Sequence, residues 1–102
     1  MAAVATSTTA RHVPSRLVVL GGGVVGVEMA QAWASLGSRV TLVHRGDRLL
    51  EREEPFAGKQ VHESLAAAGV DVRLRASAAA LCRDGAVTVT LADGSSLEAD
   101  EV

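Results

Sequence analysis

Three glycines that follow an apolar run constrain the fold of this chain more than any other feature. The run Arg16–Leu20 has the composition of a β-strand. Directly after it, Gly21, Gly23 and Gly26 have the spacing G-x-G-x-x-G, and a helical pattern extends over 24–36. With a second strand-like run they form a strand–helix–strand unit of roughly 30 residues, the frame in which this glycine spacing is informative. We therefore predict two parallel strands joined by a helix.

Each glycine of the loop is expected to have a separate role. Gly21 allows a tight turn out of the strand, where a Cβ would clash. Gly23 lets the backbone approach the pyrophosphate of a dinucleotide, and Gly26 lets the helix pack closely on the strand. The helix begins with unpaired N–H groups and a partial positive charge, which favour phosphate. We expect the following loop residues to bind the cofactor: Gly21, Gly22, Gly23, Val24, Val25 and Gly26. The alternative is a glycine-rich turn that binds no ligand.

The end of the second strand-like run, Arg39–His44, bears on which dinucleotide is bound. NAD-binding units usually have Asp or Glu here, and its carboxylate accepts hydrogen bonds from the adenosine ribose hydroxyls. In this chain the position is His44, and Arg45 follows. A carboxylate would repel a 2′-phosphate, whereas a guanidinium binds it in a bidentate manner. We therefore predict that His44 and Arg45 contact the nucleotide and that NADPH is preferred over NADH, unless Arg45 and Arg48 belong to an ordinary solvated turn.

The rest of the chain alternates helix and strand signals. The apolar face of the first helix is predicted to consist of Val25, Met29, Trp33 and Leu36. A second helix is predicted to begin at Pro55 and to end at Gly69. Its predicted apolar face is Val61, Leu65 and Ala68. Strand-like runs follow at 70–75, 86–91 and 96–102, and Asp93–Gly94 between the last two is a hairpin signal.

Composition and charge argue against several classes of function. The chain of 102 residues suffices for a single core, which should consist of Val, Leu and Ala because Trp33 and Phe56 are the only aromatic residues. The net charge of −2 indicates neither nucleic-acid nor membrane-surface binding, and no apolar run reaches the ~18 residues that span a bilayer. A single cysteine, Cys82, and histidines without ligand spacing predict no metal site. Residues 1–13 are expected to be a flexible lead-in or linker, with a transit peptide as the alternative.

Residues 14–102 resemble the NAD(P)-binding domain of the pyridine nucleotide–disulfide oxidoreductases, the flavoenzyme family of dihydrolipoamide dehydrogenase, glutathione reductase and mercuric reductase. The resemblance rests on the segments V-P-S-R-L-V-V-L-G-G-G-V-V-G-V-E, R-V-T-L-V-H-R-G-D-R-L-L and L-A-D-G-S-S-L-E-A-D-E-V. It implies an α/β fold, a Rossmann-like βαβ parallel sheet with a C-terminal β-meander, in which a four-stranded parallel core carries the meander. It also implies a domain inserted between two halves of an FAD domain, and hence a fragment of a larger FAD-containing protein.

The resemblance implies roles for individual residues as well. Glu28 occupies the position that the family places beside the nicotinamide, and Arg45 stands where NADPH-dependent members have an arginine. A second arginine of those members is replaced by Glu51, with Arg52 next to it. The family's C-x-x-x-x-C pair, FAD-binding motif and His–Glu pair have no counterpart, so no catalytic residue is expected in this chain. Cys82 is interpreted as structural, because a redox disulfide needs a partner.

These implications lead to a functional hypothesis. The chain presents the nicotinamide of NADPH or NADH for hydride transfer to FAD in the parent protein, and on to a disulfide or other acceptor. Alone it should bind the nucleotide weakly without turnover, and the parent is expected to be a cytoplasmic homodimer. One alternative is a non-catalytic nucleotide-sensing domain. Another is an S-adenosylmethionine methyltransferase fragment, disfavoured because His44 replaces the acidic residue that usually ends its second strand.

Overall fold

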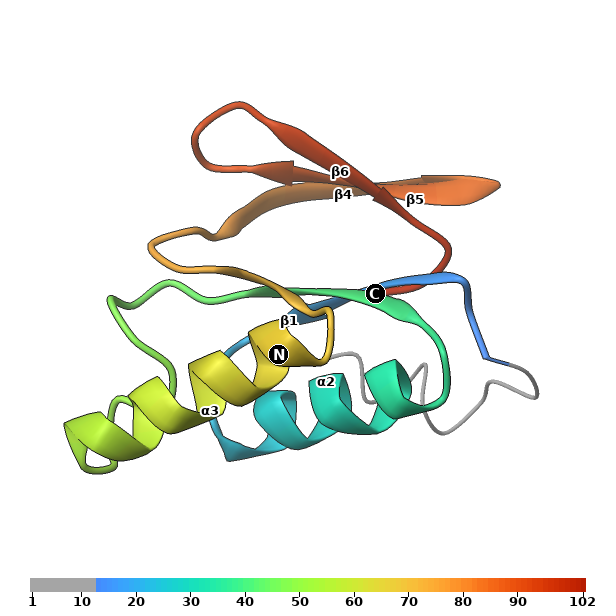
Figure 1. The fold of residues 1–102 in the computed structure, drawn as a ribbon. Helices are drawn as coiled ribbons and strands as arrows, with labels where there is room; N and C mark the ends of the chain where they lie inside the picture. The colour runs from blue at the N-terminus through green and yellow to red at the C-terminus, as the bar shows by residue number, and fades with distance from the viewer. Residues whose placement is uncertain (1–12) are drawn as a thin grey trace.

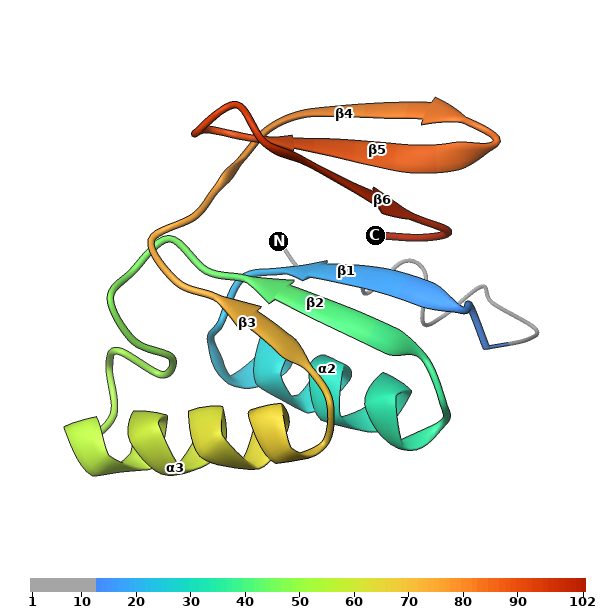
Figure 2. The same ribbon diagram turned by 45° about the horizontal axis from the view of Figure 1, so that its top comes forward.

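The computed structural model describes residues 13–102, and these form three layers (Figure 1). Two helices cover one face of a parallel sheet, and an antiparallel sheet covers the other face (Figure 2). The predicted α/β class, the βαβ unit and the C-terminal meander are therefore confirmed. The predicted lead-in, apart from Val13, lies outside the described residues.

The parallel sheet consists of β1 (Arg16–Leu20), β2 (Arg39–Val43) and β3 (Asp71–Arg73), in this order. The first connection contains α2 (Val24–Ser35), and the second contains α3 (Pro55–Ala67). All three strands run in the same direction, so their carboxyl ends meet at one edge of the sheet. This edge receives both the glycine loop and the chain segment after β2.

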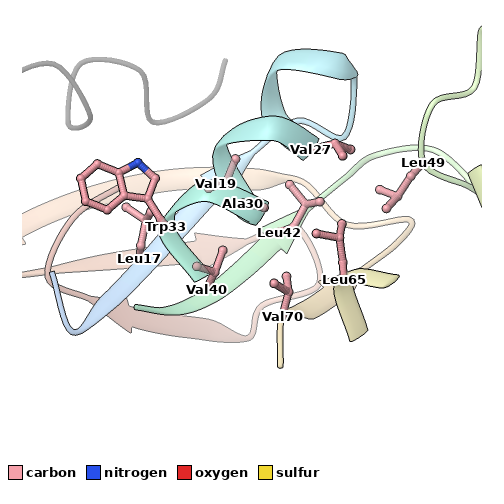
Figure 3. Packing of buried hydrophobic residues seen from close by; sticks show 10 residues of the cluster. All are labelled: Leu17, Val19, Val27, Ala30, Trp33, Val40, Leu42, Leu49, Leu65 and Val70. Carbon is pink, nitrogen blue, oxygen red and sulfur yellow. The ribbon is translucent and has the colours of Figure 1, made fainter. Parts of the chain in front are cut away.

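Both faces of the parallel sheet are buried, as its Val- and Leu-rich strands predict. The face toward the helices holds Leu17, Val19, Val27, Ala30, Trp33, Val40, Leu42, Leu49, Leu65 and Val70 (Figure 3). The opposite face holds Val18, Val43, Val87, Val89, Leu91 and Ala99. Strand alternation explains the division, because neighbouring side chains of β1 point to opposite faces of the sheet. Of the two aromatic residues, Trp33 belongs to the core and Phe56 is exposed.

The predicted apolar face of α2 is wrong in its rotational phase. Trp33 is buried and Met29 packs at the margin of the core, but Val25 and Leu36 are both more than half exposed. The buried residues of this helix are Gly26, Val27, Ala30 and Trp33. The close approach of the helix to the loop at Gly26 sets this rotation, and a glycine contributes nothing to an apolar pattern.

The second helix agrees better with its prediction. Pro55 occupies the first helical turn, where its missing N–H needs no partner. Leu65 is fully buried and Val61 packs at the margin of the core, but Ala68 is the exposed C-cap residue and does not face the core as predicted. A Cβ at Gly58 would overlap the Leu49 carbonyl, so α3 also packs closely on the loop that precedes it.

The antiparallel sheet consists of β4 (Ala78–Asp84), β5 (Ala86–Leu91) and β6 (Ser96–Ala99), with β5 in the centre. The apolar pattern of the sequence did not predict β4. Its residues do not alternate between apolar and polar, and nearly all of them are exposed, so no period-2 pattern marks it. The overlooked signal is Asp84–Gly85, because a dipeptide of this kind usually joins two strands. Asp93–Gly94 joins β5 to β6, as predicted.

The predicted strand 96–102 divides between the two sheets. β6 ends early, and Glu101 then forms a parallel bridge with Leu17 of β1. The Asp100 carboxylate accepts hydrogen bonds from the backbone N–H and the guanidinium of Arg16, at 2.8 and 3.0 Å. These bonds hold the pKa of Asp100 below its ordinary value. The described part of the parallel sheet thus has three strands and one bridge, where the family resemblance implies four strands.

Candidate functional site

The loop between β1 and α2 is a tight strand-to-helix turn. Gly21 has a φ of +108°, which other residues rarely adopt, and its N–H donates to the Val43 carbonyl at 2.8 Å. A Cβ on Gly21 would meet no neighbouring atom within 4 Å, so the backbone conformation, and not the expected clash, requires glycine here. A Cβ on Gly26 would overlap the Gly21 carbonyl oxygen. The predicted close packing at Gly26 is therefore confirmed.

Gly23 differs from both of these glycines. Its φ of −79° suits any residue, and a Cβ would meet no atom within 4 Å. Within residues 13–102, the N–H groups of Val24, Val25 and Gly26 have no hydrogen-bond acceptor, and no side chain caps the helix. The start of α2 thus presents unpaired donors and the positive end of the helix dipole, an arrangement that favours an anion.

His44 joins the glycine loop to the segment after β2. Its Nδ1 accepts a hydrogen bond from the Gly22 N–H at 3.0 Å, and its Nε2 lies 2.8 Å from Oε1 of Glu51. Because Nδ1 accepts, the proton of the neutral ring resides on Nε2 and is donated to the carboxylate. A Cβ on Gly22 would come within 2.8 Å of the imidazole, so this glycine provides the space for the ring. His44 thereby helps to hold the glycine loop in place.

A groove of about 500 Å³ opens at the carboxyl ends of β1 and β2. The glycine loop 21–23, the strand ends with His44 and Arg45, the Glu51 side chain and the segment 76–78 line it. This volume falls within the roughly 300–1,000 Å³ typical of small-molecule sites. Open α/β sheets bind ligands outside the carboxyl ends of their strands, which is where this groove lies.

The remaining predicted site residues lie around this groove at different positions. Arg45 is exposed, lines the groove, and has no ion-pair partner within residues 13–102. Val24 borders an adjacent hollow that also includes Gly22 and Glu51. Val25 and Glu28 line neither of these two hollows, and both are exposed on α2. The structure thus brings the loop and the strand end together and leaves Glu28 facing solvent.

Glu51 lines the groove although the residue pattern did not place it in the site, and the family resemblance marked it only as the replacement of an arginine. It lies in an irregular segment seven residues after His44, and only the folding of that segment brings its carboxylate back to the strand end. An acidic residue close behind His44 and Arg45 is the signal in the sequence, but many solvated loops contain one. Sequence spacing alone therefore could not identify it.

Within residues 13–102, no group of three His, Cys, Asp or Glu side chains is placed to hold a metal ion. Cys82 is free and exposed on β4, outside the groove. In the described part of the chain, neither helix has the length and apolarity required to cross a membrane.

Sequence comparison identifies the family. The profile described as pyridine nucleotide-disulphide oxidoreductase matches residues 2–102. The chain belongs to this family. This oxidoreductase domain is 44% identical over 95 residues to mercuric reductase of Streptomyces lividans, an alignment that covers 87% of this chain and 20% of that protein. It is 41% identical over 86 residues to an NAD(P)H dehydrogenase (quinone) of Mycobacterium tuberculosis, an alignment that covers 83% of this chain and 17% of that protein.

Solved structures of flavoprotein reductases share the fold. The oxidoreductase domain matches the flavoprotein disulfide reductase RclA of Escherichia coli with a TM-score of 0.83 and 30% identity, over 91% of this chain and 21% of that one. It matches LpdA of Mycobacterium tuberculosis with a TM-score of 0.82 and 38% identity, over 90% of this chain and 20% of that one. The chain thus spans about a fifth of the length of these relatives.

Proposed function

We propose that residues 14–102 form the NAD(P)H-binding domain of a larger FAD-dependent oxidoreductase. The observation that carries this proposal is the surface of the glycine loop. Neither backbone conformation nor a protein neighbour requires glycine at position 23, and the unpaired N–H groups of the first turn of α2 lie next to it. A glycine that the fold itself does not need is explained if a pyrophosphate approaches the backbone at this point.

The proposal assigns parts of the cofactor to parts of the groove. The residues proposed to hold the phosphates are Gly21, Gly22, Gly23, Val24, Val25 and Gly26. His44 positions this loop, and Arg45 binds the adenosine ribose and its 2′-phosphate. Glu28, on the second turn of α2, is proposed to lie beside the nicotinamide. When bound, the nicotinamide supplies the hydride and FAD accepts it; this chain binds and orients the cofactor and contributes no catalytic residue.

NADPH is the cofactor that we propose the groove prefers. Arg45 has no ion-pair partner within residues 13–102, so its guanidinium is available to a phosphate. Guanidinium–phosphate pairs are charge-assisted and frequently bidentate. The exposure of Arg45 means that salt should weaken the contact.

We propose that the parent protein contains FAD, passes electrons on to a disulfide or other acceptor, forms a homodimer and is cytoplasmic. The names of the relatives support the redox part, because they include mercuric reductases and a flavoprotein disulfide reductase. On this proposal the isolated chain binds the nucleotide weakly and does not turn over.

The test is a titration of the ¹⁵N-labelled chain, followed by the backbone amide signals in NMR spectra. NADPH, NADH, FAD and S-adenosylmethionine are added separately. We expect saturable shifts with the two nicotinamide dinucleotides, largest at residues 21–26 and 44–45. Binding of FAD alone would make this a flavin-binding domain, and binding of S-adenosylmethionine alone would favour a methyltransferase.

A variant at Gly23 links this binding to the loop. Gly23→Val places a branched side chain where the phosphates are proposed to lie, while the open surroundings leave room for it in the fold. We expect a folded spectrum with a modest loss of stability, because valine is a poor N-cap residue, together with loss of the NADPH-induced shifts. A folded variant with wild-type affinity would contradict the proposed phosphate site.

A further inference from the structure

The segment after β2 holds the Glu51 carboxylate at the mouth of the groove through several contacts. Leu50 adopts a left-handed φ of +51°, and its N–H donates to the Gly22 carbonyl at 3.0 Å. The Arg48 guanidinium donates to the Glu51 carbonyl oxygen at 3.1 Å. A Cβ on Gly46 would overlap the Glu51 carboxylate, so this glycine provides the space that the carboxylate occupies. The backbone and the side chain of Glu51 are both held.

The hydrogen bond to His44 uses one oxygen of the Glu51 carboxylate and leaves the other available to a ligand. Oε1 of Glu51 accepts from His44 Nε2 at 2.8 Å, and Oε2 has no hydrogen-bond partner within residues 13–102. The Glu51 side chain is 48% exposed and lines the groove. Both His44 nitrogens are engaged with protein groups, so at the groove beside the end of β2 the Glu51 carboxylate, and not the imidazole, has free acceptor capacity.

We infer that Glu51 is a specificity-determining residue of this groove, an inference that rests on the proposed function. Its carboxylate accepts a hydrogen bond from a free ribose hydroxyl and repels a 2′-phosphate, so it opposes the preference for NADPH that Arg45 creates. Arg45 and Glu51 carry opposite charges and line the same groove. The wild-type chain therefore binds both dinucleotides, with a preference smaller than Arg45 alone would produce.

The experiment compares dissociation constants for NADPH and NADH in the wild type and in Glu51→Gln. Glutamine keeps the size of the side chain but removes its charge, so NADPH should bind more tightly and NADH more weakly. We expect the ratio of the two affinities to shift toward NADPH by roughly tenfold. Glu54→Gln is the matched control. It also removes one negative charge, three residues after Glu51, but the Glu54 side chain does not line the groove.

The outcomes separate this inference from the function on which it rests. The inference is supported if the ratio of the NADPH and NADH affinities shifts toward NADPH in Glu51→Gln and is unchanged in Glu54→Gln. If the wild type binds both dinucleotides and the ratio in Glu51→Gln is unchanged, the inference fails and the proposed function stands. If the wild type binds neither, both fail. Glu51→Ser, a second neutral variant, replaces Glu51→Gln if the latter does not give a folded spectrum.

Discussion

Gly26→Ala and Gly23→Ala add the same methyl group three residues apart, and the structure predicts a large loss of stability only at Gly26. At Gly26 the new Cβ would overlap the Gly21 carbonyl oxygen and lie 2.9 Å from the carbonyl carbon. A backbone group cannot rotate aside, so α2 must move away from β1. At Gly23 the Cβ would meet no atom within 4 Å, and the φ of −79° suits alanine.

The expected magnitude follows from these contacts. Overpacking typically costs about 1–3 kcal/mol, and the backbone overlap at Gly26 places this variant near the upper limit. Alanine recovers about 1 kcal/mol, because it is the better helix former and position 26 lies in the first turn of α2. The free energy of unfolding should therefore fall by about 2 kcal/mol, which in a domain of this size lowers Tm by roughly 8–16 °C. Gly23 is the N-cap of α2, a position where alanine is less favourable than glycine, so Gly23→Ala should lower the free energy of unfolding by at most about 1 kcal/mol.

Urea unfolding followed by circular dichroism measures both variants against the wild type. A lower midpoint with an unchanged m-value would show that Gly26→Ala destabilises the native state itself. A Gly26→Ala variant as stable as the wild type would refute the reasoning, because it would mean that α2 and the loop separate without cost. A Gly23→Ala variant that loses 2 kcal/mol would equally contradict the assignment of that glycine to ligand approach.

Three further predictions concern charge and the cysteine. Arg45→Ala should weaken NADPH binding by about 1.5–3 kcal/mol, roughly ten- to a hundredfold in affinity, and the wild-type preference for NADPH should shrink with added salt; a wild type that prefers NADH would contradict the assignment. Asp100 has a pKa below its ordinary value because Arg16 donates to it, so it stabilises the fold above about pH 4 and loses this effect as the pH falls through its lowered pKa. Asp100→Asn should therefore flatten the acid limb of a stability–pH profile, and an unchanged limb would count against the pair. Cys82→Ser should leave the free energy of unfolding within about 0.5 kcal/mol, since its side chain is exposed; a larger loss in urea titrations would show a packing role.

Local chemistry made part of this protein predictable from its sequence. Strand-like runs and glycine spacing located β1, α2 and β2, because backbone conformation and steric limits act within a few residues. The close packing at Gly26 followed from the same spacing. The family resemblance correctly implied the meander, although the apolar pattern did not reveal β4.

Contacts between distant segments decided the rest. The rotation of α2 depends on where Gly26 meets the carbonyl of Gly21, and the division of residues 96–102 between two sheets depends on pairing with β1. Glu51 enters the groove because its segment folds back onto His44 and the glycine loop. Periodicity records the preferences of residues that are neighbours along the chain. The sequence by itself therefore determined most of the order of elements and the position of the glycine loop, and only tertiary packing decided which face of α2 is buried and which carboxylate borders the groove.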